Sequence, residues 1–533
     1  MTWRRLLGAV ALCGCVIAGA GWGFSRPEVE SLSRPAVPPD AEASARGEAA
    51  FRGAGFGGLS LDALATNAVP WRLIAAALVL DERARDPTAS LDEATLGRVL
   101  ARFGFLPGGE SPLPLGMTFG DIAPVGGTKV RVANLGCAAC HAGVTYAPDG
   151  AARPDQPMLG MPNTSIDLEA YTLRVFHALK RFTDGPELLA AADALFPEMD
   201  WRERLSLRFL VLPLAKKRLA ELGDATRPLP FPNGAPGSTN GVAALKFALG
   251  TALIEEGPGD AGVVSIPDLA FRTWRSDLLA DGVYAVPGSG EGVATTAPPD
   301  ADRLRALAAI TTFFTVPSMG VHPDKAQGSL GDATAIMAFL GDYRPQRFPG
   351  AVDAARAGSG RALYATGCAS CHGSYDEDLE APQLQSFPNW NGDVGTDRLR
   401  ADAFDATLVA AVETSVYRNT IAVRRNRGYA APPLAGIWAS APYLHNGSVP
   451  TLAALLSPET RPRRFMTGGH ALDFAQVGIR LDENGAYPAG YRPFSAPAWI
   501  DVATPGRGAD GHRFGEDLTI EQKRDLIEYL KLL

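Results

Sequence analysis

Cysteine is scarce in this 533-residue chain, and none of it is left for a disulfide. Of six cysteines, Cys13 and Cys15 lie near the N-terminus, and the other four belong to two Cys-x-x-Cys-His units. Long runs of one charge are also absent, and 50 basic against 58 acidic residues give a net charge of -8. This balance argues against a nucleic-acid-binding protein. Only 8% of the residues are aromatic, so we expect cofactors to supply part of the core.

The N-terminus predicts export from the cytoplasm. Two arginines precede an apolar run, within which Ala18-Gly19-Ala20 offers a small-residue cleavage site. Residues 1–24 are therefore predicted to be a signal peptide or a membrane anchor, with lipid attachment at Cys15 as a third alternative. All three place the rest of the chain in the periplasm or cell envelope. Residues 25–40, rich in Pro and Ser, are expected to form a tether.

Helical patterns cover much of the remaining chain, and strand signals are sparse. We therefore predict a mainly α fold in two regions, residues 41–345 and 350–533, divided at a linker that begins near Ala338. The first region must carry large helical and loop insertions, because the two cysteine units lie far apart. Apolar spacing predicts helices at Trp71–Asp86, Leu91–Phe103, Asp167–Phe182, Pro186–Phe196, Trp201–Leu222 and Ala351–Thr366.

An amphipathic helix is expected at the end of the chain. Thr519 and Gln522 have the spacing of a capping box at its start. Its apolar face comprises Leu526, Ile527, Leu530 and Leu533.

The two Cys-x-x-Cys-His units predict covalently bound haem. In a helical turn, residues three apart point to one side, so both cysteines can reach the vinyl groups of one porphyrin. The histidine that follows supplies a neutral imidazole to the iron. A zinc site built from two Cys-x-x-Cys pairs would not need those histidines, and a thiol redox motif would occur once, near a βαβ pattern. The two predicted haem c attachment sites are Cys137, Cys140 and His141, and Cys368, Cys371 and His372.

The second half of the chain resembles a known family. The resemblance rests on motifs that occur in order at Cys368–Tyr375, Gly395–Asp397, Ala431–Trp438, Ala441–Leu452 and Gly511-His512. This series is similar to the bacterial di-haem cytochrome c peroxidase superfamily, and within it to the branch that includes the rubber oxygenases. The first half matches only in its haem motif, in Gly160–Thr164 and in the general layout. The resemblance implies two cytochrome c-like haem domains that face each other.

The same resemblance implies different roles for the two haems. Oxygen or peroxide would react at an active haem held by His141, and a relay haem held by His372 would store or pass electrons. His512 matches the distal ligand of the second iron in the rubber-oxygenase branch. His445 is the alternative ligand, unless it orders its loop against a haem edge or propionate.

Other residues have open assignments. Phe271 is expected to line the open face of the first haem, and Trp274 is expected either to relay electrons between the haems or to pack in the core. Met158 and Met161 follow the first haem motif and are candidates for its sixth ligand, but a core methionine is more common. The resemblance implies that this sixth position is open or closed only by a weak ligand.

The remaining histidines are expected to be structural. His470 lies in a Gly-rich loop and is predicted to be at the surface. His322 precedes a proline, and His177 falls on a predicted amphipathic helix.

Three functions fit the sequence. The preferred one is a peroxidase-type oxidoreductase, although the family's peroxide-activating Gln and Glu have no clear counterpart here. The first alternative is a dioxygenase that binds oxygen at the same iron and cleaves an apolar substrate, which a hydrophobic channel lined by Phe271 would favour. The second is an electron-transfer cytochrome in which both irons have strong sixth ligands. Expected partners are a small redox donor protein or a quinol-linked cytochrome, and a calcium ion found in some relatives has no signature here.

Overall fold

The computed structural model describes residues 42–52, 69–108, 111–122, 128–253, 262–285, 294–319, 330–415, 418, 421–425 and 428–533. The predicted leader, the tether and His322 lie outside this part of the chain. Helix accounts for 42% and strand for 14% of the described residues. The chain is therefore helical as predicted, with more strand than its sequence indicates. Within those ranges no helix is both long and apolar enough to cross a bilayer.

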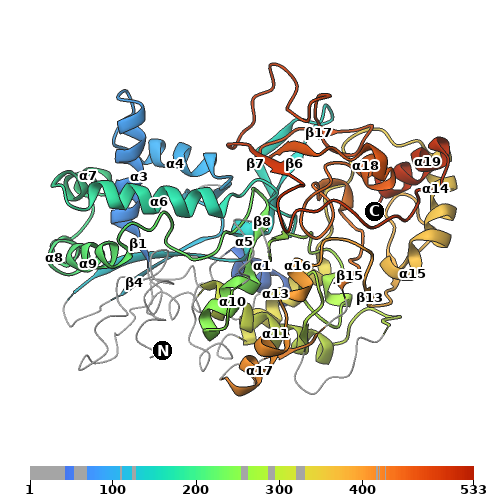
Figure 1. Ribbon diagram of the computed structural model, residues 1–533, viewed down its shortest axis with the longest axis horizontal. Coiled ribbons are helices and arrows are strands. Elements are labelled where there is room, and N and C mark those ends of the chain that lie inside the picture. Colours follow the sequence, from blue (N-terminus) through green and yellow to red (C-terminus); the bar gives the residue numbers. More distant parts are fainter. Residues whose placement is uncertain are drawn as a thin grey trace.

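Six helical elements gather at one end of the molecule (Figure 1). They bury a core of aliphatic and aromatic side chains around α3, whose central residues Leu73 to Val79 are inaccessible to solvent or nearly so. All the helices predicted for this region are present, with ends shifted by up to two residues. They are α3 (Trp71–Arg85), α4 (Glu93–Arg102), α6 (Leu168–Phe182), α7 (Glu187–Leu195), α8 (Trp201–Ser206) and α9 (Leu212–Leu222).

One predicted helix contains an irregularity. The pattern at 201–222 predicts a continuous helix, but a π-helix, η2 (Leu207–Val211), joins α8 to α9. The π-helix ends just before Pro213, which lies in the first turn of α9. Proline has no backbone N–H to donate, and this weakens the regular hydrogen-bond ladder of the turn before it.

The sheets are small and antiparallel. The largest among the described residues has the order β1-β5-β4, formed by β1 (Val69–Pro70), β5 (Val130–Leu135) and β4 (Met117–Ile122). Its register pairs Met117 with Leu135 and Ile122 with Val130. This register delivers the end of β5 directly to the first cysteine unit.

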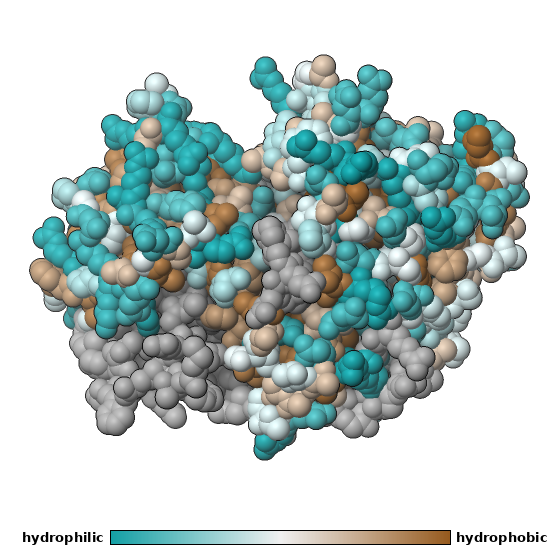
Figure 2. Space-filling view, in the orientation of Figure 1, coloured by the Kyte–Doolittle hydropathy of each residue, from teal (hydrophilic) through white to brown (hydrophobic). Residues whose placement is uncertain are grey.

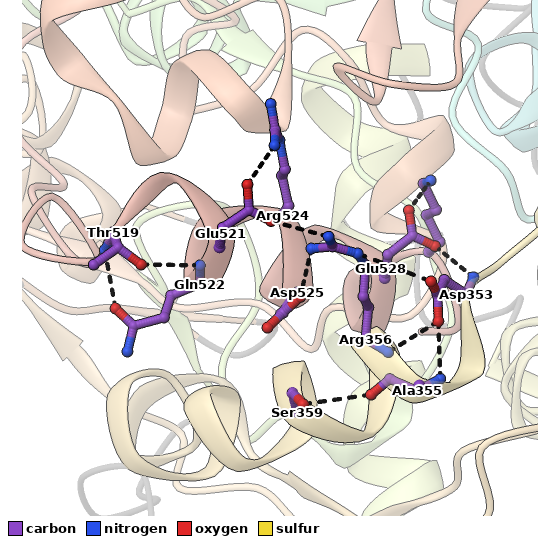
Figure 3. Close-up of polar contacts among 11 residues, drawn as sticks. Asp353, Ala355, Arg356, Ser359, Thr519, Glu521, Gln522, Arg524, Asp525 and Glu528 are labelled. Carbon is purple, nitrogen blue, oxygen red and sulfur yellow. Dashed lines mark hydrogen bonds and ion pairs between the residues drawn. The ribbon is translucent and has the colours of Figure 1, made fainter.

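The second region is closed by two helices that are distant in sequence. These are α14 (Ala354–Gly367) and α19 (Ile520–Leu530). Gly360 of α14 allows the two helices to cross closely, because a Cβ at this position would lie 2.0 Å from the carbonyl oxygen of Asp525 in α19. Figure 3 shows Arg356 of α14 paired with Glu521 and Asp525, both at 2.9 Å. These exposed pairs are worth about 0.2–1 kcal/mol each, so the buried apolar face of α19 supplies most of the attachment.

The capping box at the start of the last helix is confirmed. The Thr519 hydroxyl accepts from the Gln522 backbone N–H at 3.2 Å, and the Gln522 side chain accepts from the Thr519 N–H at 2.9 Å (Figure 3). Of the predicted apolar face, Leu526, Ile527, Leu530 and Leu533 are all buried.

The two regions share one core. The predicted linker differs from the structure, because its first residues belong to α13 (Leu330–Asp342) and Tyr343 and Phe348 are buried. A single buried cluster joins side chains of the first region, among them Tyr146 and Phe271, to those around α19. The strand pair β10 (Tyr284–Ala285) and β14 (Ala422–Val423) also crosses between the regions.

Further elements complete the chain. In the first region they are α1 (Ala43–Arg52), β2 (Pro107–Gly108), β3 (Ser111–Pro114), α5 (Cys137–Cys140), β6 (Ala142–Tyr146), β7 (Ala152–Leu159), β8 (Ser238–Thr239), α10 (Gly241–Leu249), β9 (Val264–Ser265), η3 (Arg272–Trp274) and α11 (Ala301–Met319). In the second they are α15 (Ala369–His372), β11 (Ser374–Tyr375), β12 (Leu384–Ser386), β13 (Asn391–Gly392), α16 (Leu399–Asp402), α17 (Ala406–Thr414), β15 (Tyr429–Ala430), η6 (Ile437–Ala439), α18 (Leu452–Leu456), η7 (Pro458–Thr460), β16 (Arg464–Thr467), β17 (Leu472–Asp473), β18 (Gly478–Ile479) and β19 (Ala498–Asp501).

Candidate functional site

The first cysteine unit forms a single helical turn, α5, pressed against the turn between β3 and β4. A Cβ on Gly116 would lie 1.9 Å from the backbone nitrogen of Ala139, so only glycine allows this approach. The Gly136 N–H donates to the Gly116 carbonyl at 2.7 Å. The backbone geometry that presents Cys137 and Cys140 is therefore fixed by the strands on its N-terminal side.

Asn163 fixes the same turn from the other side. Its side-chain amide donates to the Gly104 carbonyl at 2.9 Å and to the Ala139 carbonyl at 3.1 Å, and its backbone N–H donates to the Cys140 carbonyl at 2.8 Å. The side chain is 2% exposed. The sequence places Asn163 only within a matching motif, and its role as a clamp is visible only once the chain is folded.

His141 is oriented by a residue far along the chain. Its Nδ1 donates to the Pro267 carbonyl at 3.2 Å. This hydrogen bond fixes the tautomer, because a carbonyl can only accept, and leaves Nε2 with its lone pair available for a metal. Burial lowers the pKa of His141 to about 4, and the Pro267 bond opposes that shift. The imidazole is therefore neutral at pH 7, as a ligand must be.

The second unit repeats this arrangement. The Nδ1 of His372 donates to the Pro432 carbonyl at 2.7 Å, and burial lowers the pKa of His372. Beside it, the hydroxyl of Tyr364 in α14 donates to the Gly373 carbonyl at 2.8 Å. Each of the two histidines is thus held by the carbonyl of a proline, which a Cys-x-x-Cys-His pattern alone does not reveal.

His512 faces His372. Their ring centroids are 6.3 Å apart with 58° between the planes. Two metal–nitrogen bonds of about 2 Å plus the two ring radii add to nearly this separation, so one metal ion fits between the rings. Burial, followed by the charge of His372, lowers the pKa of His512 to about 4.

The loop carrying His512 is held by another of the family motifs. A Cβ on Gly511 would lie 2.2 Å from the carbonyl carbon of Gly395, and the His512 N–H donates to the Val394 carbonyl at 2.8 Å. His512 itself adopts a φ of +47°, in the region that favours glycine. A strained backbone held this tightly is common where a side chain must point at a ligand.

His445 lies elsewhere. Its ring stacks on Tyr429 at a centroid distance of 3.7 Å and an angle of 15°. Burial lowers its pKa to about 3, and the positive charges of Arg400 and Arg507 add to the effect. The structure therefore groups His445 with Tyr429 and two buried arginines, whereas His512 is the histidine that contacts the ring of His372.

The prediction that His470 lies at the surface is wrong. His470 is 2% exposed, and its Nε2 lies 3.2 Å from the Tyr146 hydroxyl across the shared core. The Gly-rich loop suggested exposure because glycines usually mark surface turns. Here the Gly469 N–H donates to the Ser165 hydroxyl at 2.9 Å, which draws the loop inward. Glycine is needed at this position because its φ is +68° and a Cβ would lie 2.8 Å from the Ser495 backbone nitrogen.

Acid should destabilise the fold partly through His470. Burial lowers its pKa from 6.5 to about 4, so between these values the unfolded chain binds more protons. The contribution of the buried neutral imidazole to the free energy of unfolding is therefore fully present above pH 6.5, and it is lost as the pH falls toward 4. We expect His470→Gln to flatten the pH dependence of the free energy of unfolding by up to about 3 kcal/mol over this window. Denaturant titrations at several pH values would measure it. The control is His177→Gln, which changes an exposed side chain, and equal slopes for wild type and both variants would contradict the assignment.

Phe271 and Trp274 are buried neighbours. Their rings meet edge to face at 6.5 Å, and Phe271 also meets Tyr375 edge to face at 6.3 Å. Phe271 has a φ of +54°, a conformation that costs a bulky side chain on the order of 1 kcal/mol. The segment from Pro267 to Trp274 therefore contacts both predicted centres. Its first residue holds His141, and Phe271 contacts Tyr375, which lies three residues after His372.

A cavity of about 740 Å³ lies against these two aromatic side chains. Arg344 borders it and places its guanidinium 4.5 Å from the centroid of the Phe271 ring. The wall is mixed rather than purely hydrophobic, since it also includes Glu42, Thr273, Thr296, Gln383 and Gln385.

Asp268 is a second residue that sequence analysis did not identify. Burial raises the pKa of its carboxyl to about 7, against the lowering effect of its hydrogen bonds. It accepts from the Tyr343 hydroxyl at 3.1 Å and from the Ala270 N–H at 2.8 Å. It follows Pro267 directly, so it braces the segment that orients His141.

The donor sets fit haem better than zinc. The four described cysteines are free and partly exposed, and each pair is followed by a histidine whose Nε2 is available. In the described part of the chain no three Cys, His, Asp or Glu side chains converge to hold a metal ion. The two cysteine pairs thus do not form one zinc site, and each can bind its own porphyrin.

Comparison with known proteins supports a cytochrome c. Residues 428–466 match a family model described as RoxA-like, cytochrome c-like. They include Pro432, whose carbonyl holds His372. A cytochrome c-like domain of this type implies covalently bound haem c and relates the chain to the rubber oxygenases.

Two proteins of Sinorhizobium fredii (strain NBRC 101917 / NGR234) are similar along more of the chain. Both are named as uncharacterized proteins. One, y4iM, is 31% identical over 39% of this chain, and the chain spans 55% of its length. The other, y4iJ, is 26% identical over 81% of this chain and 84% of its own length. The similarity thus extends well beyond the matched domain, and it is that domain which suggests a haem oxidoreductase.

Proposed function

We propose that this protein is an exported di-haem c-type oxygenase that acts on an apolar substrate, with its reaction centre at His141 and an electron-relay centre at His372 and His512. The observation that carries the proposal is the difference between the two centres. His372 has a second imidazole at metal-bridging distance, whereas among the described residues no ring contact links His141 to another histidine. The relation to rubber oxygenases favours oxygen as the oxidant.

In the first site, Cys137 and Cys140 would hold the porphyrin and His141 its iron. Haem bound there supplies an iron that activates oxygen or peroxide. The protein's own contribution is to keep His141 neutral by burial, to orient it through Pro267, and to hold that segment in place through Asp268 and Tyr343. Removing such an outer partner typically costs 10- to 100-fold in affinity or activity.

The cavity beside Phe271 is the proposed substrate chamber. Phe271 and Trp274 offer an apolar surface, and Arg344 holds the Phe271 ring by a cation–π contact. Transfer of an apolar substrate from water to this surface lowers the free energy of the system. The polar side chains that also line the chamber make it less suited to a long hydrocarbon than a fully apolar channel.

Aromatic side chains are the proposed electron path between the centres. Trp274 contacts Phe271, Phe271 contacts Tyr375, and Tyr375 contacts Tyr364 at 6.0 Å. Tyr364 in turn donates a hydrogen bond to the carbonyl of Gly373, the residue that follows His372. The electron donor is proposed to be a small redox protein or a quinol-linked cytochrome.

A peroxidase is the second candidate function. Glu42 and Gln383 line the same cavity, and they supply the acid and amide residue types that the sequence alone could not assign. A carboxyl and an amide beside the open face would move a proton between the two oxygens of a peroxide. Glu42→Gln should then abolish peroxide turnover and leave oxygen binding unchanged.

Ligand binding tests the proposal as a whole. Oxygen or carbon monoxide added to the reduced protein, and cyanide added to the oxidised protein, should perturb the absorption of one haem and leave the other unchanged. Oxygen consumption on an alkene substrate without added peroxide would support the oxygenase, and turnover only with peroxide would support the second candidate. Absence of any response in either oxidation state would show that the protein is an electron carrier.

His512→Ala should convert one low-spin haem to high-spin and raise its reduction potential. Loss of a strong nitrogen ligand removes stabilisation of the ferric state. Electron paramagnetic resonance and a redox titration measure these effects. His445→Ala is the matched control, because that ring is stacked on Tyr429, and its spectrum should stay that of the wild type. If the control loses the low-spin signal and His512→Ala does not, His445 is the ligand.

A further inference from the structure

One helical segment exposes an unusual number of large apolar side chains. The described residues include six exposed large hydrophobic side chains, and three of them lie on α8 and η2. Trp201 is 66% exposed, Leu205 47% and Phe209 69%. They follow one another at four-residue intervals, so they project from one side of the segment. A cluster of this kind on a soluble domain usually marks a contact surface.

The π-helix contributes to this surface. Phe209 lies at the centre of η2 (Leu207–Val211) while Leu207 and Val211 on either side are buried. The extra residue in the turn thus keeps the segment packed on the core and still directs Phe209 outward. π-Helices are rare and occur frequently at functional positions.

The same segment is basic. Residues 201–222 contain six basic side chains against two acidic ones, in a chain whose net charge is -8. Three of the basic side chains form ion pairs, and these are Arg204 with Asp193, Lys216 with Asp184 and Arg218 with Glu221.

Three cations remain beside the apolar row. Arg202, Arg208 and Lys217 are exposed and form no ion pair with a described carboxylate. Arg202 follows Trp201 and Arg208 precedes Phe209, so the two arginines lie on opposite sides of the row. Lys217 lies further along the same segment, in α9. Arg202 also lies 5.5 Å from the centroid of the Trp201 ring. The row is thus flanked by positive charge that no carboxylate in the described part of the chain neutralises by an ion pair.

The segment lies far from both predicted haem centres. In Figure 1, α8 and α9 form one end of the long axis, α5 is central and α15 lies toward the opposite end. Figure 2 shows hydrophobic side chains among hydrophilic ones at that end. A redox partner would need to approach a haem, so this position does not suit electron transfer.

We propose that the α8–η2–α9 face docks the protein on an anionic phospholipid bilayer. Trp201, Leu205 and Phe209 would enter the interfacial layer, where tryptophan is favoured because its ring has an apolar body and a polar N–H. Arg202, Arg208 and Lys217 would contact lipid phosphates. Apolar anchors with adjacent cations are the combination that holds peripheral proteins at membrane surfaces.

Flotation with lipid vesicles tests this proposal. The full-length protein is mixed with vesicles of phosphatidylglycerol and phosphatidylethanolamine, or with phosphatidylcholine vesicles. Because the N-terminal apolar run is itself able to bind lipid, every comparison is between variants with the same N-terminus. The apolar variant is Trp201→Gln/Leu205→Gln/Phe209→Gln, and the charge variant is Arg202→Gln/Arg208→Gln/Lys217→Gln. The control, Trp499→Gln/Ile520→Gln, removes two exposed apolar side chains elsewhere.

The wild type and the control should float with anionic vesicles, and both test variants should bind on the order of tenfold or more weakly. The charge variant should bind phosphatidylcholine vesicles as the wild type does. Equal binding of wild type and apolar variant would overturn the proposal. So would a concentration-dependent dimer in sedimentation velocity that only the apolar variant loses, since a second copy of the chain would then be the partner. Circular dichroism confirms that each variant is folded.

Discussion

Replacing Cys368 and Cys371 with alanine should leave a protein with one covalently attached haem instead of two. Each haem c is held by two thioether bonds, and the four cysteines outside the leader are free to form them. Mass spectrometry of the denatured wild type should show two retained haem masses, and the double variant one. The reciprocal variant at Cys137 and Cys140 should also retain one, and the two variants should differ in spectrum because their remaining irons differ in ligation.

This prediction depends on covalent attachment of the haem. Extraction of the wild type with acid acetone therefore gives a result that can contradict it. Haem that is removed completely from the wild type by this treatment is not bound through thioethers, and the assignment of both motifs would fail. Variants with Cys→Ser at a single position of each pair should retain haem through the remaining bond, and this separates loss of attachment from loss of folding.

His141→Ala should abolish turnover. Loss of an outer partner of a ligand typically costs 10- to 100-fold, so loss of the ligand itself should cost more than about a hundredfold. The assay is oxygen or peroxide consumption with an electron donor. The second centre should keep its low-spin spectrum, because His372 and His512 are untouched. His177→Ala is the matched control, since that histidine is exposed and its contacts are the Thr226 carbonyl at 3.2 Å and the ring of the adjacent Phe176.

Retention of turnover in His141→Ala would place the chemistry at the second haem. In that case His512 would have to leave the iron during the reaction, and the His512→Ala variant should be more active than the wild type. The two variants together therefore distinguish a reaction at the first haem from a reaction at the second.

Local features were predictable from the sequence. The spacing of Cys137, Cys140 and His141 is complete within five residues, and the capping box at Thr519 depends on two residues three apart. The helices of the first region follow from apolar periodicity because each buries one or more faces against its neighbours. All of these depend on contacts between residues close in the chain.

Long-range contacts were not predictable. Pro267 orients His141 from 126 residues away and His470 meets Tyr146 across 324 residues. Any backbone carbonyl can accept a hydrogen bond, so no residue type marks Pro267 in advance. The shared core likewise depends on which apolar faces meet, and a Pro-rich segment with buried Tyr343 looks the same in sequence as an exposed linker.

The proline carbonyls that orient the two histidines also set an order of maturation. Both lie after the histidine that they hold, by 126 residues for His141 and 60 for His372. A chain that emerges N-terminus first therefore presents each Cys-x-x-Cys-His unit before the carbonyl that will fix its ring. Thioether bonds can form while the imidazole still turns freely, and the first centre waits longer than the second for its orientation to be set. Chain order thus allows attachment and ligand alignment to be separate events in the biogenesis of this protein.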